Sequence, residues 1–159
     1  MFKILLVCTG NTCRSPMAAA LLDDMVKKAG MTGEVVVDSA GISAGRQPAS
    51  QHAQTVMRQS GLQLDKHYSK QLDAAQLKTA DLVLAMTNAH KRAIFGLLPV
   101  AEVAAMKGKI YTLTEFAGAA GDVSDPFGGS LAEYHNCAQQ LQQLLNLSWG
   151  KIVKIAGKK

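Results

Sequence analysis

Residues 7–16 read Val7-Cys8-Thr9-Gly10-Asn11-Thr12-Cys13-Arg14-Ser15-Pro16, and they decide the fold of the chain. The apolar run Ile4–Val7 delivers Cys8 to the end of a predicted buried parallel strand. Ser15 and Pro16 suit the N-cap and first turn of a helix, which the alanine- and leucine-rich residues after them continue. A loop between strand and helix aims successive backbone N–H groups at one point, near the positive end of the helix dipole. The stretch therefore predicts an anion site.

Cys8 and Arg14 carry the reactive chemistry of this stretch. The thiolate is the nucleophilic form of cysteine, and surrounding N–H donors with a nearby guanidinium favour it. Arg14 adds a planar fork that grips two oxygens of a tetrahedral oxyanion. The spacing favours nucleophilic attack on phosphorus, against the alternative of a buried, inert cysteine beside a surface arginine.

The length and composition predict one globular domain over residues 1–159, with 48% hydrophobic residues to build its core. No apolar run approaches the length that spans a bilayer, so we expect no membrane association. Met1-Phe2-Lys3 leads directly into a strand, without the small-residue cleavage site of a signal peptide. We therefore expect a cytoplasmic protein.

The cysteines and the charge narrow the possible partners. Three cysteines make no disulfide framework, and no second Cys or His pair complements Cys8 and Cys13 as metal ligands. We predict neither a metal nor a cofactor. The net charge of +5 helps to attract anionic substrates. Scattered lysines with few aromatic residues between them do not indicate nucleic-acid binding.

Strand-like and helix-like segments alternate along the whole chain, which predicts right-handed crossovers and a parallel sheet. The fold class is α/β, a three-layer sandwich with a four-stranded parallel sheet and helices on both faces. Ligands of such sheets bind beyond the carboxyl ends of the strands, where Cys8 lies. The predicted strands are 3–8, 34–40, 81–86 and 109–113, and the predicted helices are 15–29, 49–60, 72–79, one that begins at Thr87 or Asn88, and one from 131 to about 145 or beyond.

Asp125-Pro126-Phe127 is the second informative stretch. Phosphoryl transfer to a thiolate needs an acid that protonates the departing atom, and the same carboxylate can later activate water. Asp125 on a loop with Gly128 and Gly129 suits this role, although Asp-Pro and Gly-Gly are also ordinary turn residues. Considered together with the Cys8 loop, the catalytic interpretation is the better one.

The remaining polar residues give weaker signals. Ser39 and His67 are candidates to brace the loop by hydrogen bonding. Cys13 is either an inert small hydrophobe or a thiol that traps oxidised Cys8 as a disulfide. Cys137 on the last helix is expected in the core. The histidines on predicted helices are expected at the surface, namely His52, His90 and His135.

Four stretches in this order resemble the low-molecular-weight protein tyrosine phosphatases: Cys8–Pro16, Ser39–Gly41, Asp81–Met86 and Asp125–Phe127. The resemblance covers essentially the whole chain. It implies a cysteinyl-phosphate intermediate without a metal, phosphorylated protein substrates and inorganic phosphate as product. It also implies that Cys8 is the nucleophile, Arg14 the phosphate clamp and Asp125 the general acid, that Ser15 hydrogen-bonds the thiolate, and that Asn11, Ser39 and His67 hold the loop in shape. The expected phosphate- and substrate-binding residues are Thr9, Gly10, Asn11, Thr12, Cys13, Ser15 and Phe127.

Thr12 points to one branch of this family. Most members that act on phosphotyrosine carry a bulky aliphatic residue there, and aromatic residues at the pocket mouth. Here the loop after Ser39 has no aromatic residue, and the acid loop offers only Phe127. Thr9 with Thr12, and the stretch Gly121–Ser130, are similar to bacterial protein arginine phosphatases. We therefore expect phosphoarginine in proteins as the substrate.

Three alternatives remain from the sequence. A phosphotyrosine phosphatase would use the same scaffold. Arsenate reduction needs further thiols near the site, and residues 65–105 contain no cysteine. A non-catalytic phosphoprotein-binding module would require an inert Cys8 beside an arginine and a candidate acid.

Overall fold

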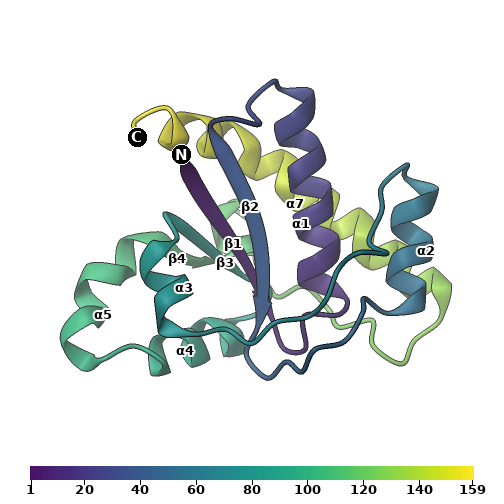
Figure 1. Cartoon of the computed structure of the whole chain (residues 1–159), viewed down its shortest axis with the longest axis horizontal. Coiled ribbons are helices and arrows are strands. Elements are labelled where there is room, and N and C mark those ends of the chain that lie inside the picture. Colours follow the sequence, from purple (N-terminus) through teal and green to yellow (C-terminus); the bar gives the residue numbers. More distant parts are fainter.

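Strand β1 (Phe2–Cys8) lies inside the sheet of the computed structural model, which describes residues 1–159. It pairs in parallel with β2 (Val35–Gly41) on one side and with β3 (Leu82–Ala85) on the other. Strand β4 (Ile110–Thr112) pairs with β3, which gives the order β2-β1-β3-β4 (Figure 1). The predicted four-stranded parallel sheet is confirmed.

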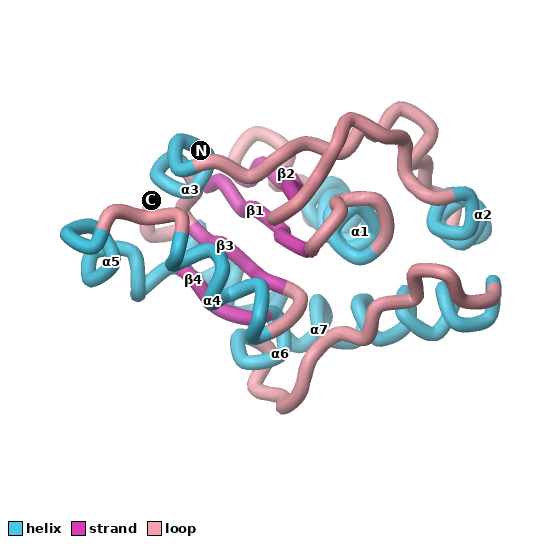
Figure 2. The backbone as a smooth tube through the Cα atoms, turned by 90° about the horizontal axis from the view of Figure 1, so that it is seen from below, coloured by secondary structure: helices cyan, strands magenta, loops and turns pink.

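Helices cover both faces of this sheet (Figure 2). Their bounds are α1 Arg14–Lys28, α2 Gln51–Gln59, α3 Ala74–Thr79, α4 Asn88–Gly96, α5 Val100–Met106, the 3-10 turn η1 Lys107–Lys109, α6 Leu113–Phe116 and α7 Leu131–Ala156. Side chains of α1, α2, α6 and α7 pack on one face, and those of α3, α4 and α5 pack on the other. The predicted three-layer arrangement is therefore confirmed.

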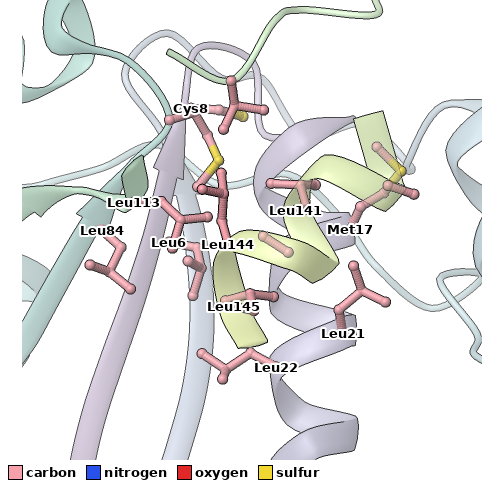
Figure 3. Close-up of a cluster of buried hydrophobic side chains, with 14 of the residues drawn as sticks. Leu6, Cys8, Met17, Leu21, Leu22, Leu84, Leu113, Leu141, Leu144 and Leu145 are labelled. Carbon is pink, nitrogen blue, oxygen red and sulfur yellow. The ribbon is translucent and has the colours of Figure 1, made fainter. Parts of the chain in front are cut away.

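The alternation of side chains along β1 divides the core in two. Ile4, Leu6 and Cys8 face the larger cluster, which α1 and α7 complete, whereas Leu5 and Val7 face the smaller cluster under α3 and α4. Figure 3 shows Leu6 and Cys8 on the side of α1 and α7. Because Cys8 is the last residue of β1, the core fixes its backbone and leaves the next residues to form a loop.

The structure differs from the predicted elements at the start of α1 and by two additional short helices. Helix α1 begins at Arg14 with Cys13, not Ser15, as its N-cap residue. Helix α7 continues beyond residue 145, as predicted, to Ala156, and its buried residues Ser148 and Ile152 extend the stripe that packs on the sheet. The short helices α5 and α6 were not predicted. No helix combines the length and the apolar character needed to cross a membrane.

Candidate active site

The loop from Cys8 to Arg14 forms one wall of a cavity of about 340 Å³ at the carboxyl end of β1. This wall contributes Cys8, Thr9, Gly10, Thr12, Cys13 and Arg14. The opposite wall comes from two other loops and consists of Ser43, Gly45, Gln47, Asp125 and Phe127. The structure thus brings together the Cys8 loop and the Asp125 loop, which lie more than a hundred residues apart in the sequence.

The hydrogen bonds around Cys8 fix where one proton points. Ser15 Oγ lies 2.9 Å from Cys8 Sγ, and Asn11 Nδ2 donates a hydrogen bond of 2.8 Å to the same hydroxyl oxygen. Because Asn11 occupies an acceptor position of Ser15, the Ser15 hydroxyl proton is free to point at the sulfur. A donor so directed stabilises the thiolate more than the thiol.

Asn11 is the scaffold of the loop. It is fully buried and adopts a left-handed backbone conformation, with φ of 57°, a conformation that asparagine tolerates better than most residues. Its Nδ2 also donates to Ser39 Oγ at 2.9 Å, and its Oδ1 accepts from the Lys70 backbone N–H at 3.0 Å. His67 Nε2 donates to the Asn11 carbonyl at 2.8 Å. Ser39 and His67 therefore support the loop through their hydrogen bonds with Asn11.

Arg14 and Asp125 meet over the cavity. The Arg14 side chain is buried, donates from Nη1 to the Val123 carbonyl at 3.1 Å, and places Nη2 3.4 Å from Asp125 Oδ2. A guanidinium has five N–H donors, so others remain for the oxygens of a bound phosphoryl group. Asp125 is half exposed, and its Oδ1 accepts from the Phe127 N–H at 3.1 Å, which leaves the carboxylate able to reach a substrate.

Phe127 and Thr12 both line the cavity, but they differ in how exposed they are. The Phe127 side chain is 74% exposed at the cavity rim. Thr12 comes from the Cys8 loop and is partly exposed to the cavity. Phe127 is the only aromatic residue that lines the cavity.

The expected surface position of His90 is wrong. His90 is 7% exposed, and its Nε2 lies 2.7 Å from Thr9 Oγ1 of the loop. Burial lowers the pKa of His90 to about 4, and the positive charge of Arg14 acts in the same direction. The sequence held one signal, because His90 precedes Ile94 by four residues and so shares the buried face of α4. His52 and His135 are exposed, as predicted.

Cys13 and Tyr134 form a second group beside the cavity. Cys13 Sγ lies 3.3 Å from Tyr134 Oη and 3.5 Å from Ser50 Oγ, and all three cysteines are free. Burial, together with the Cys13 contact, raises the pKa of Tyr134 to about 12. Tyr134 carried no sequence signal. Cys137 is buried as predicted, and burial raises the pKa of its thiol to about 12.

No three side chains of His, Cys, Asp or Glu gather where they could hold a metal ion. The chemistry that the site offers from its own residues is a sulfur nucleophile, a guanidinium clamp and a carboxylate.

A nucleophilic cysteine in a strand-to-helix anion loop, with an arginine at the loop end and a carboxylate above it, defines the class of cysteine-dependent phosphatases. The chain belongs to the low molecular weight phosphotyrosine protein phosphatase family, whose model matches residues 3–154. The α/β fold and the comparison thus agree on a phosphatase of this family.

Relatives within the family carry two kinds of name. A protein-arginine-phosphatase of Geobacillus stearothermophilus is 42% identical over 147 residues, which cover 91% of this chain and 92% of that protein. A low molecular weight protein tyrosine phosphatase from T. tengcongensis has a solved structure with a TM-score of 0.87 and 38% identity, covering 95% of this chain and 99% of the other. A YwlE arginine phosphatase with serine in place of cysteine, solved with a phosphorylated active site serine, gives a TM-score of 0.85 and 37% identity, covering 96% and 97%.

Proposed function

We propose that this chain, acting as one catalytic domain over residues 1–159, hydrolyses phosphoarginine in proteins through a phosphate ester of Cys8. The observation that carries the proposal is the lining of the cavity. Thr12 lines the cavity from the same loop as the nucleophile, and Asp125 Oδ2 lies 3.4 Å from Arg14 Nη2. A slender cationic substrate side chain fits these residues better than a phenyl ring does.

In the first step, the Cys8 thiolate attacks phosphorus and the P–N bond breaks. The electron pair of that bond goes to the guanidino nitrogen, which takes the proton of the protonated Asp125 carboxyl group and leaves Asp125 as a carboxylate. The loop N–H groups and Arg14 stabilise the charge on the phosphoryl oxygens, because they are fixed before the reaction begins.

In the second step, water attacks the phosphorus of the cysteinyl phosphate. The Asp125 carboxylate takes a proton from that water, the S–P bond breaks, and its electron pair returns to Cys8 as the thiolate. Inorganic phosphate leaves. The hydroxyl of Ser15 at 2.9 Å stabilises the departing sulfur by the same hydrogen bond that stabilises it as a nucleophile.

Two residues of the cavity support arginine as the phosphorylated amino acid of the substrate. The half-exposed Asp125 carboxyl group can pair with the substrate guanidino group and, in its protonated form, give its proton to the leaving nitrogen. Phe127 at the rim offers an aromatic face to a planar cation. The relative from Geobacillus stearothermophilus carries the arginine phosphatase name.

Phosphotyrosine is the second candidate, because the T. tengcongensis relative carries the tyrosine phosphatase name. A phenyl ring is bound best between apolar walls, yet apart from Phe127 the wall opposite the loop consists of Ser43, Gly45, Gln47 and Asp125. The lining therefore favours phosphoarginine.

We further propose that the protein acts in the cytoplasm, which is a reducing compartment. The nucleophile must be a free thiol, and Cys8, Cys13 and Cys137 are all unpaired.

The test compares turnover of phosphoarginine and phosphotyrosine within one peptide sequence, for the native chain and for Thr12→Ile. We expect the native chain to prefer phosphoarginine and Thr12→Ile to lose that preference, because the added methyl group narrows the space beside Cys8. Thr12→Val keeps the volume and removes only the hydroxyl, so its preference should lie between the two. A preference for phosphotyrosine in both the native chain and Thr12→Ile would contradict the proposal.

A further inference from the structure

His90 joins helix α4 to the loop that carries the nucleophile. It lies in the first turn of α4, where its backbone N–H donates to Thr87 Oγ1 at 3.1 Å. Its side chain is buried, and Nε2 lies 2.7 Å from Thr9 Oγ1, the residue directly after Cys8. The two residues are 81 positions apart, so this bond ties two separate parts of the fold together.

The imidazole makes no other hydrogen bond with the protein. Its Nδ1 is buried and has no partner, and such an atom costs free energy because it loses water without replacement. The ring is neutral, because burial and Arg14 disfavour its charged form more than the nearby carboxylates of Asp122 and Asp125 favour it. An apolar ring would fill the same space without that cost, so the packing of α4 gives no reason for a histidine.

Four other hydrogen bonds of the loop come from the side of β2. Ile42 N–H donates to the Cys8 carbonyl and Ser43 N–H to the Thr9 carbonyl, both at 2.9 Å, and both donors follow β2. His67 and Lys70 hold Asn11 from the same side. The hydrogen bond of His90 is the one that reaches the start of the loop from α4.

We propose that His90 is a positioning residue of the phosphatase reaction. Its hydrogen bond to Thr9 Oγ1 fixes the peptide that follows Cys8, and thereby the direction of the sulfur and of the loop N–H groups toward the bound phosphoryl group. The proposal rests on the catalytic role of Cys8 given above and does not depend on which phosphorylated amino acid is the substrate.

Displacement of a reacting group by about 1 Å can cost roughly 10²-fold in rate. Replacement of His90 therefore lowers kcat by about ten- to a hundredfold. KM rises by a smaller factor than kcat falls, because the Arg14 clamp still holds the phosphoryl group while the loop N–H groups that share its binding lose their direction. Since the imidazole stabilises the loop at the expense of a buried, unpaired Nδ1, its replacement by an apolar ring leaves the melting temperature unchanged or raises it.

The test uses three variants in the full chain at pH 7.5, with kcat and KM on an aryl phosphate and on the phosphoarginine peptide. His90→Phe removes the bond and keeps the ring. His90→Gln carries an amide that reaches the position of Nε2, whereas His90→Asn reaches only that of Nδ1. We expect His90→Phe and His90→Asn to lose kcat, His90→Gln to recover most of it, and His90→Phe to retain the native melting temperature. Native kcat in His90→Phe, or a loss in His90→Gln equal to that in His90→Phe, would overturn the proposal.

A double-mutant cycle with Thr9→Val supplies the second test. If His90 acts through Thr9, each single substitution lowers kcat, and the double variant loses kcat by no larger a factor than a single variant does. Independent, multiplying losses would overturn the proposal.

A binding measurement separates this proposal from the proposed function. Binding of inorganic phosphate, followed by calorimetry, needs no turnover. We expect His90→Phe to bind phosphate more weakly than His90→Gln does, and equal binding by both would count against the positioning role. Absence of turnover in the native chain would instead contradict the proposed function.

Discussion

At the scale of single residues, the directions of the hydrogen bonds around Cys8 matter most for the chemistry of the site. Asn11 Nδ2 donates to Ser15 Oγ, so the hydroxyl of Ser15 is left to donate to the sulfur. These two hydrogen bonds place a donor at Cys8 Sγ. The hydrogen bonds of Asn11 also explain why this residue is fully buried although it is polar, since both its side-chain oxygen and its nitrogen have partners.

Asp125→Asn should lower kcat on phosphoarginine by about 10²–10⁴-fold, because the variant can neither protonate the leaving nitrogen nor activate water. The matched control is Asp122→Asn on the same loop. Asp122 Oδ1 accepts from the Asn88 backbone N–H, and an asparagine keeps that oxygen. We expect near-native kcat for the control. Near-native kcat in Asp125→Asn would assign the acid role to another residue.

Protonation of His90 should link stability to pH. The pKa of His90 in the folded chain, about 4, lies below the ordinary value of 6.5, so the unfolded chain binds more protons between these two pH values. The full free energy of unfolding is therefore present above pH 6.5, and part of it is lost as the pH falls toward 4.

We expect the free energy of unfolding of the native chain to fall between pH 7 and pH 4 by on the order of 2–3 kcal/mol more than that of His90→Phe. Urea titrations at both pH values measure the difference. Equal falls for the two proteins would show that His90 is not held neutral by the fold.

At the scale of elements, the strand-to-helix unit of β1 and α1 could be predicted because two independent signals agree. The apolar run before Cys8 requires burial, and Ser15-Pro16 favours the start of a helix. Helix α5 lacked such signals. It begins after Pro99 without a side-chain cap, and its first residue, Val100, is almost fully exposed, so no apolar stripe marks it.

The site was predictable where residues are close in sequence and less so where the fold brings them together. Residues 8–15 follow one another, and their spacing alone indicates a loop that binds an anion. His90 and Tyr134 contact this loop from helices far along the chain, and their residue types are common on exposed helix faces. Only the crossing of α4 and α7 past the sheet determines that these two side chains face the loop.

The end of β2 packs against the loop closely enough to require glycine. A Cβ atom at Gly41 would lie 2.6 Å from the Thr9 carbonyl oxygen and 2.9 Å from Ala44 Cβ. Gly41→Ala should therefore lower the free energy of unfolding by about 1–3 kcal/mol, as expected for overpacking, and should lower kcat because the loop must shift. Gly33→Ala is the control, since a Cβ there meets no atom within 4 Å. Thermal unfolding of both variants decides, and equal stability would refute the close approach.

The molecule as a whole is held by the larger cluster between the sheet and α1 and α7, which Figure 3 displays around Leu6, Leu22 and Leu145. Helix α7 runs across this face, so its buried residues join the site end of the sheet to its opposite end. Stability should therefore depend on α7 although it contributes no side chain to the cavity wall.

Leu145→Ala should lower the free energy of unfolding by about 2–5 kcal/mol, because Leu145 is completely buried and its truncation leaves a cavity. Leu147 lies two residues further on α7 with 63% of its surface exposed, and Leu147→Ala should change stability by less than about 0.5 kcal/mol. Denaturant titration compares the two. Similar losses would mean that the face of α7 is assigned wrongly.

Trapping of the phosphoenzyme tests the central claim most directly. The native chain is mixed with a phosphoarginine peptide, quenched within the first turnover, digested and analysed by mass spectrometry, with Cys8→Ser as a parallel sample for turnover. We expect a phosphoryl group on the peptide that contains Cys8, and no turnover in Cys8→Ser. Phosphate on another residue, or continued turnover in Cys8→Ser, would contradict the mechanism.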